Sequence, residues 1–278
     1  MNETWLKIDG LKVLVTGGTK GAGAAIASRF ASAGADVIVS GRTAPEALPA
    51  GIEFVPADLT SGTGPSQLAT VAEYRLGGVD ILVNVVGGSS APGGGFAALT
   101  DSLWTAELNL NLMSSVRLDR AVLPGMIERG SGVIIHVTSI QARMPLPEST
   151  TAYAAAKAAL SAYSKSLSKE VAPQGVRVMR VAPGWIETEA ATALAGRLAE
   201  AAGTDVEGGK KIIMDSLGGI PIGRPTCPDE IADLVAFLAS PRSAAITGPD
   251  DVIECRPIPA VQVVPRLQPP PHTAASRR

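Results

Sequence analysis

The chain has 278 residues, of which 46% are hydrophobic and only 4% aromatic, and its formal net charge is −2 at pH 7. This length and composition suit one large α/β domain, in which small aliphatic side chains pack helices onto a parallel sheet, better than an aromatic-rich β sandwich. The charge balance and the lack of a basic patch exclude nucleic acid as an expected partner.

The two cysteines, Cys227 and Cys255, lie far apart in the sequence and form neither a disulfide framework nor a metal-ligand cluster. We therefore expect no metal site and a reducing compartment. The first ten residues lack the apolar core of a signal peptide, and no apolar run is long enough to cross a bilayer. The sequence predicts a soluble, cytoplasmic protein with no membrane partner.

The first predicted element is a buried strand at Lys12–Val15, which a glycine-rich turn joins to a helix at Ala24–Ala33. Gly34 is a plausible end of this helix, and Val37–Val39 is the next strand. Strand, glycine-rich turn, helix and strand within about thirty residues is the context that a dinucleotide fingerprint needs.

Strands and helices continue to alternate along the chain. The further strands are predicted at Ile52–Val55, Ile81–Asn84, Val133–Val137, Val176–Val181 and Val252–Ile253. The further helices are predicted at Pro65–Leu76, at Asp101–Arg129 and from Thr151 to about Val171, and the second of them is expected to kink at Pro124. A last helix is predicted to begin at a capping box formed by Thr226 and Asp229 and to run to Leu238. The pattern predicts an α/β fold, a single doubly wound Rossmann-type parallel sheet of about seven strands with helices on both faces. The domain covers residues 1–256, and a Pro-rich, flexible tail covers 257–278.

The turn after the first strand carries Gly17, Gly21 and Gly23. Glycines let backbone N–H groups approach a pyrophosphate at a helix N-terminus, where the helix dipole favours an anion. The second strand ends in Ser40-Gly41-Arg42, without the carboxylate that would hold a ribose 2′-hydroxyl, and Lys20 lies in the turn. Two cations and no acid predict NADP (NADPH) rather than NAD, the alternative being that both cations are ordinary solvated charges.

Tyr153 and Lys157 are four residues apart in an Ala-rich helix and therefore share a face. A nearby ammonium favours the phenolate, so we expect it to lower the pKa of Tyr153 and make this phenol a proton donor and acceptor at working pH. The alternative is a surface lysine beside a half-buried tyrosine. His136, in the middle of a strand, is expected to be a packed, hydrogen-bonded core residue.

The chain resembles the short-chain dehydrogenase/reductase family from about residue 10 to 253. The motifs that carry the resemblance occur in family order: Thr16-Gly17, Gly21-x-Gly23, Asp58, Asn84-Val85-Val86-Gly87-Gly88, Asn111, Ser139, Tyr153, Lys157 and Pro183-Gly184. The resemblance implies an oxidoreductase that transfers hydride between a nicotinamide and a ketone or secondary alcohol. The asparagine motif departs from the usual family pattern at Val85 and Val86, and residues 253–256 depart from it near the C-terminus, where they bear on a subunit contact.

The resemblance also implies the roles of single residues. Tyr153 would exchange a proton with the substrate oxygen, Lys157 would tune Tyr153 and bind the nicotinamide ribose, Ser139 would hold the substrate carbonyl, and Asn111 would anchor a water in a proton relay. Asp58 and Leu59 would contact adenine, Asn84 would tie the central strands beside the cofactor, and Thr188 would bind the carboxamide. The cofactor-binding set expected in this way is Gly17, Thr19, Lys20, Gly21, Gly23, Arg42, Asp58, Leu59, Asn84, Tyr153, Lys157, Pro183, Gly184, Ile186 and Thr188.

The segment of about residues 189–220 is predicted to form a lid over the substrate. Met144, Leu146 and Trp185 suggest a partly apolar pocket for a small-molecule ketone or alcohol. The resemblance implies a homo-oligomer, a tetramer or dimer built on the Tyr153 helix and the long helix before it. Two other readings stay open: a catalytically silent NADP-binding regulatory or scaffold protein, and a nucleotide-sugar lyase or epimerase, for which the chain after the sixth strand is short.

Overall fold

The computed structural model describes residues 3–92, 94–145, 150–216, 219–220 and 222–253. Its centre is a seven-stranded sheet in the order β3-β2-β1-β4-β5-β6-β7, with every neighbouring pair parallel. The strands are β1 Lys12–Thr16, β2 Asp36–Gly41, β3 Ile52–Pro56, β4 Ile81–Asn84, β5 Gly132–Val137, β6 Val176–Pro183 and β7 Asp250–Ile253. The α-helices are α1 Gly21–Ser32, α2 Gly64–Leu76, α3 Asp101–Leu108, α4 Ser114–Glu128, α5 Thr151–Val171, α6 Glu189–Ala202, α7 Val206–Ser216 and α8 Pro228–Ala239.

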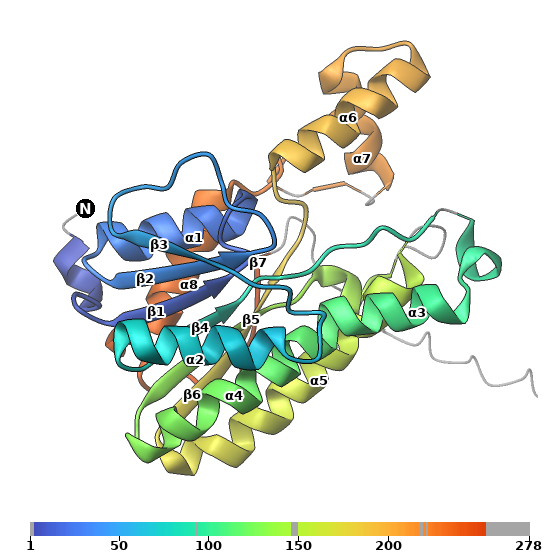
Figure 1. The fold of residues 1–278 in the computed structure, drawn as a ribbon. Helices are drawn as coiled ribbons and strands as arrows, with labels where there is room; N and C mark the ends of the chain where they lie inside the picture. Colours follow the sequence, from blue (N-terminus) through green and yellow to red (C-terminus); the bar gives the residue numbers. More distant parts are fainter. Residues whose placement is uncertain (1–2, 93, 146–149, 217–218, 221, 254–278) are drawn as a thin grey trace, which may run out of the picture.

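The central strands are apolar runs because helices cover both of their faces. Every residue of β4 and β5 is buried. Alternate side chains face opposite layers: Val13 and Val15 of β1 pack in the layer of α1 and α8, whereas Leu14 packs in the layer of α2, α4 and α5. Figure 1 shows α1 and α8 on one side of the sheet and α2, α4 and α5 on the other. The predicted α/β, doubly wound fold is confirmed.

The strand order reverses between β1 and β4, because the chain first builds outward from β1 to β3 and then returns to build from β4 to β7. In an open α/β sheet the crevice at such a reversal, beyond the carboxyl ends of the strands, is where ligands bind. The loops after β1, β4 and β5 meet at this end of the sheet. Helices α6 and α7 form a hairpin that extends beyond it (Figure 1).

The structure corrects three predicted boundaries. The predicted helix over 101–129 is divided into α3 and α4 by a π-helical turn, η3 Asn109–Met113, within which the side chain of Asn111 bonds to the carbonyl of Glu107. Helix α1 begins at Gly21 instead of Ala24. The capping box of α8 lies one residue later than predicted, since the Glu230 carboxylate accepts a bond from the backbone N–H of Cys227 at 2.8 Å. The predicted tail at 257–278 lies outside the described residues.

Candidate active site

The glycine-rich turn after β1 has the conformation that a phosphate cradle requires. Gly17 and Gly21 have φ values of +66° and +53°, which side chains rarely adopt, and a Cβ on Gly23 would overlap the carbonyl oxygen of Gly17. Helix α1 starts at Gly21, and neither an acidic side chain in its first turn nor a side-chain cap at Lys20 occupies its N-terminal N–H groups. The turn therefore fits the pyrophosphate of a dinucleotide.

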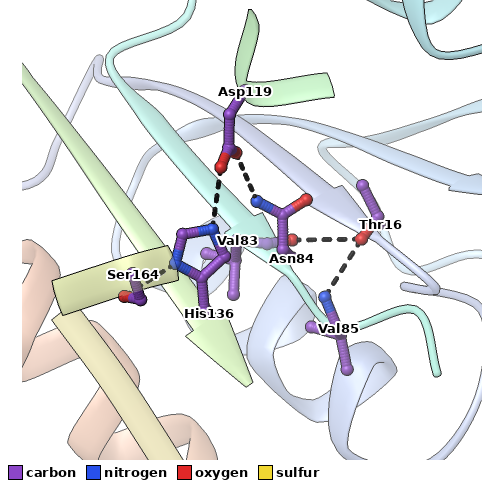
Figure 2. A network of polar contacts seen from close by, with 7 residues as sticks. All are labelled: Thr16, Val83, Asn84, Val85, Asp119, His136 and Ser164. Atoms are coloured by element: carbon purple, nitrogen blue, oxygen red, sulfur yellow. Dashed lines mark hydrogen bonds and ion pairs between the residues drawn. The ribbon is translucent and has the colours of Figure 1, made fainter. Parts of the chain in front are cut away.

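Thr16, at the end of β1, fastens this turn to the next strand. Its hydroxyl lies 3.4 Å from the carbonyl oxygen of Val83, and it accepts a bond from the backbone N–H of Val85 at 3.0 Å (Figure 2). It also accepts from the backbone N–H of Val86 at 3.3 Å. The sequence interpretation gave the strand-tying role to Asn84. In the structure Thr16 makes a side-chain link between the end of β1 and the end of β4, and Asn84 connects β4 to β5.

Asn84 belongs to a buried polar network that links β4, β5 and two helices. Its amide donates to Asp119 of α4 at 2.8 Å, and the other oxygen of Asp119 lies 2.9 Å from Nε2 of His136 (Figure 2). Nδ1 of His136 lies 3.0 Å from the hydroxyl of Ser164 on α5. His136 is fully buried, which confirms its prediction as a hydrogen-bonded core residue.

Ser139, at the end of β5, and Tyr153, in the first turn of α5, face the same cavity of about 800 Å³. The Ser139 side chain hydrogen-bonds to the phenol of Tyr153. Ser139 also caps the short helix η4 Ile140–Ala142 by accepting from the N–H of Gln141. The chain after β5 therefore brings the hydroxyl of Ser139 into contact with the phenol of Tyr153 on α5.

The pKa of Tyr153 moves opposite to the sequence prediction. Burial raises it because the phenolate loses hydration, and the negative charge of Glu107 raises it further, while the bond from Ser139 acts in the other direction. Lys157 does not compensate: its Nζ lies 5.9 Å from the ring centroid of Tyr153 and donates to the carbonyl of Val137 at 3.0 Å. Burial also lowers the pKa of Lys157 to about 8. The predicted lowering of the Tyr153 pKa is therefore wrong for this arrangement, in which the phenol stays protonated at neutral pH.

Asn111 and Lys157 meet at Gly87, in the loop after β4. A Cβ on Gly87 would lie 2.7 Å from Nζ of Lys157 and 2.9 Å from Oδ1 of Asn111. Asn111 is fully buried and exchanges two bonds with the backbone of Gly88, each 2.9 Å long. Ser139, Tyr153 and Lys157 thus line the cavity, and Asn111 lies behind the part of its wall that Gly87 and Gly88 form.

The remaining walls of the cavity come from the segment after β6 and from the helical hairpin. Pro183, Gly184, Ile186 and Thr188 line it, as does Trp185. The methyl group of Thr188 would lie 3.1 Å from a Cβ on Gly21, so this segment also reaches the glycine-rich turn. Three residues were expected to form a partly apolar substrate pocket. Trp185 lines the cavity and Met144 does not. Leu146 lies outside the described residues. Ile140, Ile212 and Ile213 supply the apolar surface instead.

The other cofactor candidates lie at the ends of β1, β2 and β3, outside this cavity. Arg42 and Lys20 are exposed, and Thr19 lies against Gly41. One oxygen of Asp58 accepts from the N–H and hydroxyl of Thr60, and these bonds, together with the charge of Arg42, lower its pKa. Leu59 is buried in the layer of α2.

Sequence reasoning missed Glu107, which is 4% exposed and hydrogen-bonds to Asn111. Its spacing of four residues before Asn111 in a predicted helix was the available signal.

Among the described residues, no helix has the length and apolar character of a membrane span. In the same part of the chain, no group of three or more His, Cys, Asp or Glu side chains could hold a metal ion.

Comparison with known proteins gives the family. Residues 11–198 match the family model described as short chain dehydrogenase. A 3-oxoacyl-(acyl-carrier-protein) reductase of Vibrio cholerae is 37% identical over 251 residues, which cover 87% of this chain and 95% of the relative.

Solved structures agree with this assignment. L-sorbose reductase of Gluconobacter frateurii, complexed with NADPH and L-sorbose, has a TM-score of 0.82 and 32% identity, covering 89% of this chain and 96% of that one. Aldohexose dehydrogenase of Thermoplasma acidophilum has a TM-score of 0.80 and 26% identity, with coverage of 92% and 99%. The chain therefore belongs to the short-chain dehydrogenase family and is an oxidoreductase that acts on alcohol and carbonyl groups.

Proposed function

We propose that this protein is an NADP(H)-dependent oxidoreductase that interconverts a ketone and a secondary alcohol, with Tyr153 as the acid and base. The observation that carries the proposal is the hydrogen bond between Ser139 and Tyr153 in a cavity that Lys157 and the segment from Pro183 to Thr188 also line. A carbonyl oxygen placed between the two hydroxyls would meet two donors.

The roles of the residues follow from the negative charge that develops on the substrate oxygen. When bound, NADPH supplies the hydride, and negative charge then develops on the substrate oxygen. Ser139 donates a hydrogen bond to that oxygen, and the protonated phenol of Tyr153 gives up its proton to it. Lys157 and Asn111 hold the loop and strand end beside Tyr153 through their bonds to Val137 and Gly88. Donors of this type contribute about 3 kcal/mol each to stabilising the transition state.

The cofactor residues support NADP over NAD. Arg42 and Lys20 are exposed cations at the end of β2 and in the turn after β1, where a 2′-phosphate would lie. Gly17, Gly21 and Gly23 would hold the pyrophosphate, Asp58 and Leu59 the adenine, and Pro183, Gly184, Ile186 and Thr188 the nicotinamide. The relative solved with L-sorbose was complexed with NADPH, which supports the same choice.

We extend the proposal to the substrate lid and the assembly. Helices α6 and α7 place Ala191, Ile212 and Ile213 on the cavity, so their hairpin would cover a bound substrate. By analogy with the family, the protein would be a cytoplasmic homo-oligomer, a tetramer or dimer, formed through α4 and α5.

The test is a screen of carbonyl compounds with NADPH and NADH, including a 3-oxoacyl thioester and a ketose, read by the absorbance of the reduced nicotinamide. We expect turnover with NADPH and at least one compound. Tyr153→Phe should retain NADPH affinity and lose about a hundredfold or more of kcat. Tyr74→Phe is the matched control, since Tyr74 is 89% exposed on α2. NADPH binding without oxidation by any compound would instead favour the catalytically silent protein, and full activity of Tyr153→Phe would remove this tyrosine from its role.

A further inference from the structure

Glu107 is a buried carboxylate, and burying a carboxylate costs free energy because the charge loses its hydration. It lies near the end of α3, is 4% exposed, and directs both oxygens to hydrogen-bond donors. Oε2 accepts from the side-chain amide of Asn111 at 3.0 Å. Oε1 accepts from the hydroxyl of Ser89 at 2.8 Å and the backbone N–H of Ser90 at 3.3 Å. Such a group persists because its bonds compensate for its loss of hydration.

The contact with Asn111 fixes which way the amide points. An ionised carboxylate only accepts, so the NH₂ of Asn111 must face Glu107 and its Oδ1 must face away. In that orientation Oδ1 accepts from the N–H of Gly88 at 2.9 Å and lies beside Gly87, where Nζ of Lys157 also lies. A flipped amide would set two donors against each other at the N–H of Gly88 and two acceptors against each other at Glu107.

The same carboxylate holds the loop that follows β4. Glu107 binds Ser89 and Ser90, and Asn111 binds Gly88, so three consecutive loop residues are attached to the end of α3 and the π-helical turn after it. Gly87 and Gly88 line the cavity with Lys157. A displacement of this loop would therefore move the wall against which Lys157 rests.

We infer that Glu107 is a positioning residue of the proton-transfer set, which acts on Lys157 through Asn111 and the loop at 87–90 and on Tyr153 through its charge. The inference rests on the proposed function, because it assumes that Tyr153 moves the proton and that Lys157 and Asn111 hold the structure beside it.

The effect of the Glu107 charge on the pKa of Tyr153 has a defined direction. The titratable neighbours of Tyr153 are Glu107 on α3 and Lys157 on its own helix, and Ser139 faces it from the end of β5. The charge of Glu107 raises the pKa of Tyr153. Removing that charge should therefore lower the pKa of Tyr153 and displace its titration to lower pH.

The first experiment needs no substrate. The chain has three tyrosines: Tyr74 is exposed, burial raises the pKa of Tyr163, and Tyr153 can be identified by its loss in Tyr153→Phe. We would follow tyrosinate absorbance against pH in the parent and in Glu107→Gln, with far-ultraviolet circular dichroism to confirm that the fold persists. The expected result is a shift of the Tyr153 titration to lower pH in Glu107→Gln and no shift in Asp101→Asn, which removes an exposed charge from the first turn of the same helix.

The second experiment uses the best compound of the carbonyl screen. Glu107→Gln can still accept from Asn111 through its amide oxygen, whereas Glu107→Leu has no acceptor. We expect kcat to fall about tenfold in Glu107→Gln and about a hundredfold in Glu107→Leu, with KM for NADPH little changed and Asp101→Asn unaffected.

The outcomes separate the two proposals. If Tyr153→Phe lost turnover while Glu107→Gln kept the parent kcat and Tyr153 titration, the role of Glu107 would be overturned and the proposed function would stand. A lower melting temperature of both Glu107 variants, with unchanged kcat and titration below it, would show that Glu107 only stabilises the loop and would overturn the inference as well. If Tyr153→Phe kept full activity, the proposed function itself would fail.

Discussion

The most informative single change is Lys157→Met, because it should make the protein more stable while it abolishes turnover. Lys157 is 2% exposed, and burial lowers its pKa from 10.5 to about 8. At pH 7 the folded protein must therefore keep an ammonium where its charge is poorly hydrated. Methionine has nearly the same length and carries no charge.

The magnitude follows from linkage. Each unit of pKa difference between the folded and unfolded states corresponds to about 1.4 kcal/mol, so the charged form costs about 3 kcal/mol at pH 7. The bond from Nζ to the carbonyl of Val137 offsets about 1 kcal/mol of that cost and is lost in the variant. The net gain is about 2 kcal/mol, or about 4–8 °C in melting temperature for a protein of this size.

The sign of the pH dependence is also fixed. Between pH 8 and 10.5 the unfolded chain holds a proton that the folded chain has lost, so stability of the parent rises with pH through this window. The advantage of Lys157→Met should therefore be full at pH 7 and nearly absent at pH 10. Urea unfolding of both proteins at these two pH values measures the difference.

Lys165→Met is the matched control, since Lys165 is an exposed lysine two turns further along α5. It should show no comparable gain at pH 7. A Lys157→Met protein that is less stable than the parent at pH 7, or whose advantage is the same at both pH values, would refute the reasoning.

Four further changes test the site and its supports. Thr16→Val should lower the free energy of unfolding by about 1–2 kcal/mol in urea because the backbone N–H of Val85 loses its acceptor; unchanged stability would show that the strand link is dispensable. Asp119→Ala should cost about 3 kcal/mol, since it leaves buried donors on two residues without a partner, and a loss below 1 kcal/mol would contradict this. Gly23→Ala should weaken NADPH binding about tenfold or more, measured by fluorescence titration, whereas Gly62→Ala, with open space at its Cβ, should not; equal affinities would count against the phosphate cradle. Arg42→Ala should weaken NADPH much more than NADH, and equal weakening would remove it from the 2′-phosphate.

Much of the candidate site was predictable because its residues follow the ends of strands. Parallel strands bring their carboxyl ends to one edge of the sheet, so Gly17 after β1, Gly87 after β4, Ser139 after β5 and Pro183 at the end of β6 had to converge once the alternation of strands and helices was recognised. Helical spacing likewise placed Lys157 beneath Tyr153 without any tertiary information.

The boundaries that failed depended on contacts across the fold. The long helix predicted over 101–129 has a regular pattern, and its π-helical turn arises where Asn111 bonds to Glu107 and to the loop after β4. The capping box of α8 moved to Cys227 and Glu230 because Thr226 is drawn into a backbone bridge with Ile186. Both places make hydrogen bonds or bridges to residues distant in the sequence, Gly88 and Ile186, and sequence spacing does not report such contacts.

The sequence by itself determined the alternation of strands and helices of a doubly wound sheet and the identity of a serine, a tyrosine and a lysine that belong to its site. It did so because periodicity and chain direction are local properties that close packing then enforces. Only the tertiary structure decided the protonation of those groups. The pKa of Tyr153 depends on how deeply the phenol is buried and on the charge of Glu107 from another helix, and both are set by packing between elements, which no local pattern encodes.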